Sequence, residues 1–324
     1  LVAWALLPGG GLRPADEPRW RRWLGTVVFV LGLAGHLWWR HHTYGAWLPN
    51  TFYAKTGDLA GQLRTGLPYA LAFLMRYALP LGLVAAAATV RGGGDALRRP
   101  QGLLTMALLL GWLGYAAAVG GDMLGMFRFF APLLPVGAVL VVATAAGARW
   151  LASPPRAALV VLPLGAVLAV SSFEGRERRL VDAHMSEANL LGWMLAGDAL
   201  AEQLPPGTTI ALGPAGYIPW RTGLRTLDFY GIVTPAIARR QVTFRHGYTG
   251  HEKTDGAYIV SRRPDCILIG NVDITDRPRE GLIPPLDREV DIVLDRRFQQ
   301  EYEQAWLPVA GGKVLNYFRR KDLR

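Results

Sequence analysis

An aspartate and an arginine have the types and the spacing that most directly suggest chemistry. Asp122 and Arg128 lie in the run Gly120-Gly-Asp-Met-Leu-Gly-Met-Phe-Arg-Phe-Phe-Ala-Pro132, with glycines on both sides of the aspartate. A guanidinium can hold a phosphate through two parallel hydrogen bonds. A carboxylate can orient a sugar hydroxyl or the arginine through hydrogen bonds. An ion pair that only holds the loop is the alternative interpretation.

A second polar run, from His41 to Lys55, is rich in aromatic, histidine and asparagine residues. An aromatic belt at lipid headgroups would explain its tryptophans and tyrosines but not its other polar residues. The adjacent histidines would diverge by about 100° on a helix, so they do not predict a metal site. The predicted substrate contacts in this run are His41, Tyr44, Asn50, Tyr53 and Lys55.

Three further polar residues, His251, Glu252 and Lys253, follow one another and offer a base, an acid and a cation. We predict that they contact substrate, and a solvated surface turn is the alternative. The loop Gly213–Pro219 follows a predicted strand, where α/β folds usually contact ligands. It lacks the glycine patterns of nucleotide-binding loops. No Ser-His-Asp or HExxH pattern can be drawn from the six histidines.

The elements that must position these residues change in character near Val170. Residues 1–170 carry 14 Lys and Arg against 5 Asp and Glu, whereas the rest of the chain carries 21 against 20. A nucleic-acid-binding domain needs a basic face, so the near-neutral second half predicts no nucleic acid partner. The single cysteine, Cys266, excludes an internal disulfide and lies in a predicted buried strand.

Five mostly apolar segments in the first half meet, or nearly meet, the length of about 20 residues that a membrane-spanning helix needs. Nine arginines lie in three of the loops beside them, which the positive-inside rule places in the cytoplasm. Asp122, Arg128 and everything after Val170 would then lie outside. A further segment is expected before Leu1, because the chain begins within an apolar stretch. The five segments are Trp23–Trp39, Leu67–Val90, Leu103–Val119, Ala131–Ala148 and Ala157–Val170.

We therefore predict a membrane all-α bundle over residues 1–172, with about five transmembrane helices and an N-terminal remnant. A soluble, extracytoplasmic α/β domain is predicted over residues 173–324. The predicted location is the plasma (inner) membrane, with several passes. In the α/β domain, apolar periodicity predicts a long helix, a short helix and four strands. These are the helices Arg179–Leu204 and Ala257–Val260 and the strands Thr209–Gly213, Cys266–Gly270, Glu289–Leu294 and Lys313–Phe318.

Five runs of this sequence together resemble a family of polytopic membrane proteins. In chain order they are WLPNTFYAK, GGDMLGMFRFFAP, GPAGYIP, DFYGIVTP and GHEK. The chain resembles the GT-C type membrane glycosyltransferases, in particular the actinobacterial terminal arabinofuranosyltransferases and the related flagellar motor control protein family. The resemblance extends from about Tyr44 to about Asp265. It implies that the family's catalytic carboxylate lies in an outer loop before Leu1.

The resemblance implies a membrane glycosyltransferase that moves a sugar, with arabinofuranose the favoured case, from a polyprenyl-phosphate donor to a cell-envelope glycan. The lipid bilayer is a further expected partner. Within this chain Asp122 is the predicted catalytic base, and orientation of substrate or phosphate is its alternative role. No cofactor is expected, since no ligand pattern supports a divalent cation.

Two other functions are compatible with the same residues. The chief alternative is a non-catalytic membrane protein of the envelope or the flagellar motor, with an outer binding domain. A small-solute transporter is less favoured, because the sequence has no inverted repeats.

Overall fold

A computed structural model of the chain describes residues 19–78, 100–122, 127–147, 176–244 and 250–323, and the positions 82, 153, 155, 158, 162, 165 and 166. The chain forms two compact units. The first comprises Leu1–Leu48 and Leu59–Arg176, and the second comprises Pro49–Asp58 and Glu177–Arg324. The short segment Pro49–Asp58, which we predicted as part of the helical half, therefore belongs to the second unit.

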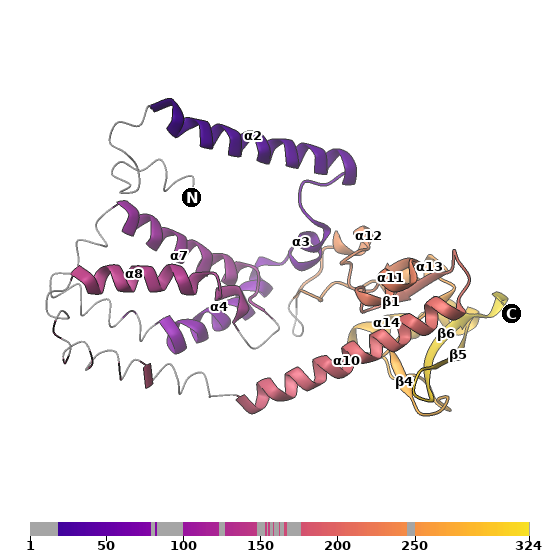
Figure 1. Ribbon diagram of the computed structural model, residues 1–324. Helices are drawn as coiled ribbons and strands as arrows, with labels where there is room; N and C mark the ends of the chain where they lie inside the picture. Colours follow the sequence, from indigo (N-terminus) through magenta and orange to yellow (C-terminus); the bar gives the residue numbers. More distant parts are fainter. Residues whose placement is uncertain are drawn as a thin grey trace. The chain divides into compact units, whose positions relative to one another are not determined.

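The first unit is helical in its described residues. Helix α4 packs against α7, and a glycine permits their close approach: a Cβ on Gly66 would lie 2.0 Å from the carbonyl oxygen of Ala117. Phe73 and Phe130 stack beside this crossing, with ring centroids 4.1 Å apart. The elements are α2 (Arg19–Tyr44), α4 (Leu59–Phe73), the π-helical turn η1 (Leu74–Ala78), α7 (Pro100–Ala118), the 3-10 turn η3 (Arg128–Phe130) and α8 (Leu133–Gly147) (Figure 1).

The predicted membrane bundle is contradicted. Within the residues that the structure describes, no helix combines the length and the apolar character that crossing a bilayer requires. Helices α4 and α8 have only 15 residues each, against the roughly 20 that a span needs. Helix α2 has 26 residues but carries basic side chains near both ends. The predicted segment Ala157–Val170 lies largely outside the described residues.

The second unit combines helices with a mixed sheet of six strands. The sheet order is β2-β1-β3-β6-β4, and β5 pairs with β6. The pairs β1–β2 and β1–β3 are parallel, whereas β6 runs antiparallel to β3, β4 and β5. The strands are β1 (Thr209–Leu212), β2 (Arg225–Asp228), β3 (Cys266–Ile267), β4 (Asp273–Thr275), β5 (Tyr302–Val309) and β6 (Lys313–Arg320).

Helices cover both faces of this sheet. Side chains alternate between the faces along each strand, and apolar side chains of β1 are buried on both of them. Ile210 and Leu212 face α10 and pack with its Leu200. Ala211 lies on the opposite face, in a cluster with Ile259 of α13. The helices and turns are α3 (Asn50–Lys55), α10 (Arg176–Gln203), α11 (Tyr217–Thr222), α12 (Pro235–Ala238), α13 (Gly256–Ser261), η5 (Asp287–Glu289), α14 (Val290–Val293), α15 (Arg296–Glu301) and η6 (Lys321–Leu323).

One predicted strand is wrong. Residues 289–294 form the end of η5 and the helix α14 instead. In a strand, Val290 and Ile292 would share one face. In the structure Val290 is exposed, whereas Ile292 and Val293 are buried in succession, as a helical turn allows. The strands β2, β4 and β5 were not predicted.

The close contact of α4 with α7 gives a test of the first unit's packing. In Gly66→Ala the new methyl group would collide with the backbone of α7, so we expect a loss of about 1–3 kcal/mol of unfolding free energy. The matched control is Gly111→Ala on α7, where a Cβ meets nothing within 4 Å. That substitution should be neutral or stabilising by up to about 1 kcal/mol. Thermal unfolding of the two variants distinguishes them, and equal melting temperatures would contradict the packing.

Candidate functional site

Loops from three parallel strands meet at the carboxyl edge of the second unit's sheet, where α/β folds usually bind ligands. Tyr230 lies at their centre, two residues after the end of β2. Its ring packs on the loop after β1 so closely that a Cβ on Gly213 would lie 2.9 Å from it. The rings of His251 and Tyr230 are nearly perpendicular, with their centroids 5.5 Å apart. The guanidinium carbon of Arg288 lies 4.4 Å from the centroid of the Tyr230 ring.

A buried carboxyl group, Glu289, completes this cluster. Its Oε2 accepts hydrogen bonds from the backbone N–H groups of Gly270, at 2.8 Å, and Leu286, at 3.0 Å. The Tyr230 hydroxyl donates to its Oε1 at 3.4 Å. Burial raises the pKa of Glu289 above its usual range. Burial first, and then the neighbouring carboxylate, raise the pKa of the Tyr230 hydroxyl.

The cluster is closed at its centre and more open at its rim. Glu289 is fully buried and Tyr230 is 6% exposed, so neither is placed to meet a solute directly. Arg288 and His251 are half-buried. The cluster therefore places the guanidinium of Arg288 and the imidazole of His251 at the edge of the sheet. Glu289 and Tyr230 fix the loops beneath these two side chains.

A second buried carboxyl group, Asp228, shapes the loop that carries Tyr230. Its oxygens accept from the N–H of Tyr230 at 2.8 Å and the N–H of Val233 at 2.9 Å. Its own N–H donates to the Thr234 hydroxyl at 2.8 Å. Burial raises the pKa of Asp228, and the backbone N–H groups oppose that rise. All these bonds lie within residues 228–234, so Asp228 maintains the loop conformation.

Asn50 ties the segment Pro49–Asp58 to the same loop. Its amide nitrogen donates to the carbonyl oxygens of Gly231, at 2.7 Å, and Ile232, at 2.9 Å. Near the other end of the segment, the Asp58 carboxylate accepts from the N–H of Phe244 at 2.7 Å. The segment is therefore held by side-chain hydrogen bonds at both ends.

Lys253 holds the middle of this segment. Its side chain is 2% exposed, and its ammonium donates to the carbonyl oxygens of Tyr53, at 2.7 Å, and Ala238, at 2.8 Å. Burial lowers the pKa of Lys253, because an ammonium loses hydration there. The guanidinium carbon of Arg239 lies 5.7 Å from the Tyr53 ring centroid. Lys253 thus joins two backbone segments, and it does not point to an open site.

The structure brings six of the nine predicted contact residues into the second unit and leaves three, His41, Tyr44 and Arg128, in the first. His41 and Tyr44 end α2 in the first unit. The His41 ring lies 4.3 Å from that of Trp47, and Tyr44 is exposed beside Arg40. The backbone of Gly250 packs against the side chain of Lys55. The six in the second unit are Asn50, Tyr53, Lys55, His251, Glu252 and Lys253.

Asp122 and Arg128 form an ion pair in the first unit. Both carboxylate oxygens are engaged: Nε of Arg128 donates to Oδ2, and Nη2 donates to Oδ1 at 3.0 Å. This bond raises the pKa of Arg128. The Asp122 side chain is 3% exposed, whereas that of Arg128 is 53% exposed. Solvent therefore meets the guanidinium rather than the carboxylate, which favours an orienting role for Asp122 over that of a base.

The turn before this pair is fixed on α4. A Cβ on Gly121 would lie 2.7 Å from the Tyr69 ring, so only glycine fits. Burial and then the Asp122 carboxylate raise the pKa of Tyr69 to about 12. The Thr65 hydroxyl donates to the carbonyl oxygen of Gly120 at 3.1 Å. The turn that carries Asp122 thus has one defined position at the end of α7.

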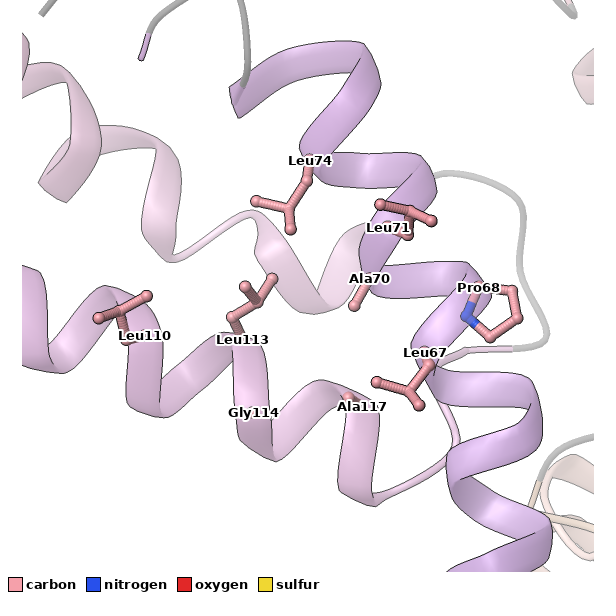
Figure 2. Close-up of a pocket in the computed structure, with 9 residues that line it drawn as sticks. All are labelled: Leu67, Pro68, Ala70, Leu71, Leu74, Leu110, Leu113, Gly114 and Ala117. Atoms are coloured by element: carbon pink, nitrogen blue, oxygen red, sulfur yellow. The ribbon is translucent and has the colours of Figure 1, made fainter. Parts of the chain in front are cut away.

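An apolar groove of about 610 Å³ lies between α4 and α7. Figure 2 shows the side chains of Leu67, Leu74 and Leu113 pointing into the space between the two helices. Ala117 lines one end, and the next residues along the chain form the turn that carries Asp122. No lining residue has a polar side chain: they are Leu67, Pro68, Ala70, Leu71, Leu74, Leu110, Leu113, Gly114 and Ala117.

No pattern in the sequence indicated the Tyr230–Glu289 contact. Tyr230 lies in the run DFYGIVTP, which we had singled out, but Glu289 was assigned to a strand and Arg288 to no role. Glu289 is 59 residues from Tyr230 in sequence, and no local pattern joins them. Among the described residues, no group of three or more His, Cys, Asp or Glu side chains is placed to hold a metal ion.

Comparison with known proteins identifies one similarity, in the second unit. Residues 183–317 match a family described as a domain of unknown function (DUF8728). The matched range includes the sheet, except for the last three residues of β6, and the Tyr230–Glu289 cluster, but not the segment Pro49–Asp58. No curated protein and no solved structure matches the chain.

The two hydrogen bonds that the Asn50 amide nitrogen donates can be tested by replacing that nitrogen with an oxygen. In Asn50→Asp a carboxylate oxygen replaces the amide nitrogen and faces two carbonyl oxygens, so we expect a loss of about 1–3 kcal/mol of unfolding free energy. Hydrogen exchange should also rise in residues 50–58 and 229–234. Gln300→Glu, the same chemical change on the exposed face of α15, is the control. If hydrogen exchange in these residues were unchanged in Asn50→Asp, Asn50 would not hold the segment Pro49–Asp58 to the loop.

The raised pKa of Glu289 predicts a pH dependence of stability. Because the folded carboxyl ionises above the ordinary value of 4.5, the unfolded chain loses its proton first as the pH rises. The free energy of unfolding should therefore fall from about pH 4.5 upward until the folded carboxyl also ionises. Glu289→Gln keeps an acceptor for both backbone N–H groups and should reduce this fall, with the remainder due to Asp228. Urea titrations at several pH values measure it.

Glu202→Gln, on the exposed surface of α10, is the control for this titration and should leave the pH profile unchanged. A Glu289→Gln profile identical to that of the unsubstituted protein would show that Glu289 is not the titrating group.

Proposed function

We propose that this chain forms part of a glycosyltransferase that moves a sugar from a polyprenyl-phosphate donor to a cell-envelope glycan, working at a lipid bilayer. The observation that carries the proposal is the apolar groove of the first unit, which ends beside the turn of Asp122 and Arg128. Arabinofuranose is the sugar favoured by the resemblance of the five sequence runs to the GT-C type enzymes.

The groove supports an apolar chain as one part of the ligand. Its volume of about 610 Å³ is within the range of ordinary ligand pockets, about 300–1,000 Å³. Its lining offers no hydrogen-bonding side chain, so a polar ligand would lose hydration without compensation. A branched hydrocarbon such as a polyprenyl tail would instead gain about 25 cal/mol for each Å² of apolar surface removed from water.

Arg128 supports a phosphate as the other part. The N–H groups of Gly120 and Gly121 donate to the carbonyl oxygens of Ala117, at 3.2 Å, and Ala116, at 2.9 Å, so the turn continues directly from the groove wall. Arg128 is 53% exposed although Asp122 holds it. Because a guanidinium has five N–H donors, it can retain a carboxylate on one side and bind phosphate oxygens with the rest.

In the proposed reaction the acceptor hydroxyl oxygen forms a bond to the anomeric carbon of the sugar. The bond from that carbon to the phosphate oxygen breaks, and the lipid phosphate leaves with the electron pair. Arg128 stabilises the charge that develops on this leaving group. Asp122 acts as a positioning residue for Arg128, and the hydroxyl proton passes to a carboxylate outside this pair.

The groove and the transfer can be tested together with two glycines of α7. A Cβ on Gly114 or on Gly111 meets nothing within 4 Å, but only Gly114 lines the groove. Gly114→Leu should fill the groove and raise the KM for a long-chain donor by about tenfold or more, an effect of about 1.4 kcal/mol. Gly111→Leu, the matched control, should leave the KM unchanged. Transfer of labelled sugar by the full-length protein is the measurement.

Arg128→Ala should lower transfer from both long-chain and short-chain donors, because each carries the phosphate. Gly114→Leu should spare the short-chain donor, which does not reach the groove. Equal KM values for Gly114→Leu and Gly111→Leu with the long-chain donor would remove the groove from the mechanism.

A non-catalytic binding protein of the envelope or flagellar motor is the second candidate. The bonds of Asn50 and Lys253 favour it, because both side chains hold backbone carbonyls instead of facing a substrate. Absence of transfer by the full-length protein with every donor, together with binding to envelope material, would support this candidate against the first.

A further inference from the structure

The side chain of Trp220 in α11 of the second unit is 77% exposed, the highest value among the exposed large apolar side chains of the described residues. A single exposed apolar side chain is common on protein surfaces and needs no ligand to explain it. The residues around Trp220 therefore decide whether its ring is part of a binding site.

The surface beside Trp220 packs closely on α10. The Tyr217 ring lies beside it, with centroids 5.6 Å apart and ring planes inclined by 52°. Tyr217 in turn rests on α10, where a Cβ on Gly197 would lie 2.9 Å from the tyrosine ring. The helix α11 ends at Thr222 and is capped by Gly223, which has a positive φ of 63° and donates its N–H to the carbonyl oxygen of Pro219. The Tyr217 ring is thus held in place beside Trp220, so a ligand that stacks on it would cost little conformational entropy at the tyrosine.

A charged pair borders the two rings. Asp198 of α10 accepts from the Tyr217 hydroxyl at 3.1 Å and from Nε of Arg221 at 2.7 Å. Both bonds go to the same oxygen, Oδ1, and within the described part of the chain no hydrogen bond goes to Oδ2. The side chains remain 46% and 41% exposed for Asp198 and Arg221 respectively. A carboxylate oxygen and a guanidinium are thus available to a ligand beside an exposed indole face.

We propose that Trp220, Tyr217, Asp198 and Arg221 form a binding surface for a glycan. The face of an aromatic ring carries partial negative charge, which suits the C–H bonds on one face of a sugar ring. Neighbouring sugar hydroxyls both donate and accept hydrogen bonds, so one can donate to Asp198 while the next accepts from Arg221. An aromatic platform beside a donor and an acceptor is the combination that a neutral, hydroxyl-rich ring requires.

The charges at this surface distinguish a glycan from an anionic lipid surface. Attraction to anionic headgroups increases with the number of basic residues near the bilayer, whereas Arg221 is paired with Asp198 and the pair has no net charge. A protein partner is the remaining alternative, and the experiment includes it as an outcome.

This inference goes beyond the proposed sugar transfer and does not depend on it. The surface lies in the second unit, whereas the groove and Arg128 lie in the first. Binding at Trp220 requires no donor and no bond to break, so a chain without transferase activity can still hold a glycan there.

The test is isothermal titration calorimetry of the full-length protein with soluble, neutral oligosaccharides, namely a linear arabinan hexamer and a linear β-glucan hexamer. We expect binding of at least one, weakened about tenfold or more in Trp220→Ala and less in Trp220→Phe, which keeps an aromatic face. Asp198→Asn should also weaken binding. The matched control is Trp306→Ala, because Trp306 lies on β5 of the same unit and is 52% exposed.

Melting temperatures should be alike in Trp220→Ala and Trp306→Ala, since both rings are exposed. The inference would be overturned if neither oligosaccharide gave a heat of binding, or if Trp220→Ala and Trp306→Ala weakened binding equally. It would also be overturned if Trp220→Ala lost binding to anionic vesicles or to a protein while its binding to glycan was unchanged. Glycan binding that depends on Trp220 in a protein without transferase activity would support the inference and reject the proposed transfer.

Discussion

The second unit depends on a buried ammonium that joins distant parts of the chain. Lys253 donates to the carbonyl oxygen of Tyr53, which lies 200 residues earlier, and to that of Ala238. A buried charge without partners would destabilise the fold strongly, and here the ammonium is stabilised by these two backbone oxygens. The segment Pro49–Asp58 is therefore an integral part of the unit, and the C-terminal residues alone would leave Lys253 with one of its acceptors missing.

The same use of polar side chains recurs at the carboxyl edge of the sheet. Asp228 and Glu289 are both fully buried, and each accepts hydrogen bonds from backbone N–H groups of the loops that follow the parallel strands. Burial alone would disfavour such carboxylates, and the N–H donors offset part of that cost. The run DFYGIVTP, which the sequence singled out through its resemblance, thus contributes Asp228 to the framework of the loops. Residues that could meet a ligand lie on the rim, as Arg288 and His251 do.

The first unit is organised by close helix contact. Gly66 lets α4 approach the end of α7, and Gly121 lets the next turn pack on Tyr69. These contacts bring an apolar groove and an exposed, oriented guanidinium into one unit. An apolar space that ends beside a cation suits a lipid phosphate, which joins a hydrocarbon chain to an anion. The proposed function rests on this juxtaposition together with the resemblance of five sequence runs.

Local elements were predictable from the sequence alone, because their periodicity is local. The long helix α10, the strands β1 and β6 and the short helix α13 are confirmed within a few residues. The run at residues 289–294 was not, since a short apolar run fits a strand or a buried helical turn equally well. The membrane bundle was inferred from hydropathy alone, and the helices that form in the described residues do not meet the requirement for a span.

The sequence by itself also determined which residues could carry charge and chemistry, because residue type fixes the available donors, acceptors and protons. Only the tertiary structure decided which of them face a ligand. Asn50 and Lys253 hold backbone carbonyls, Asp122 holds Arg128, and Tyr230 meets Glu289 across 59 residues. These roles follow from contacts between residues far apart in sequence, and no periodicity or spacing within one segment encodes such contacts.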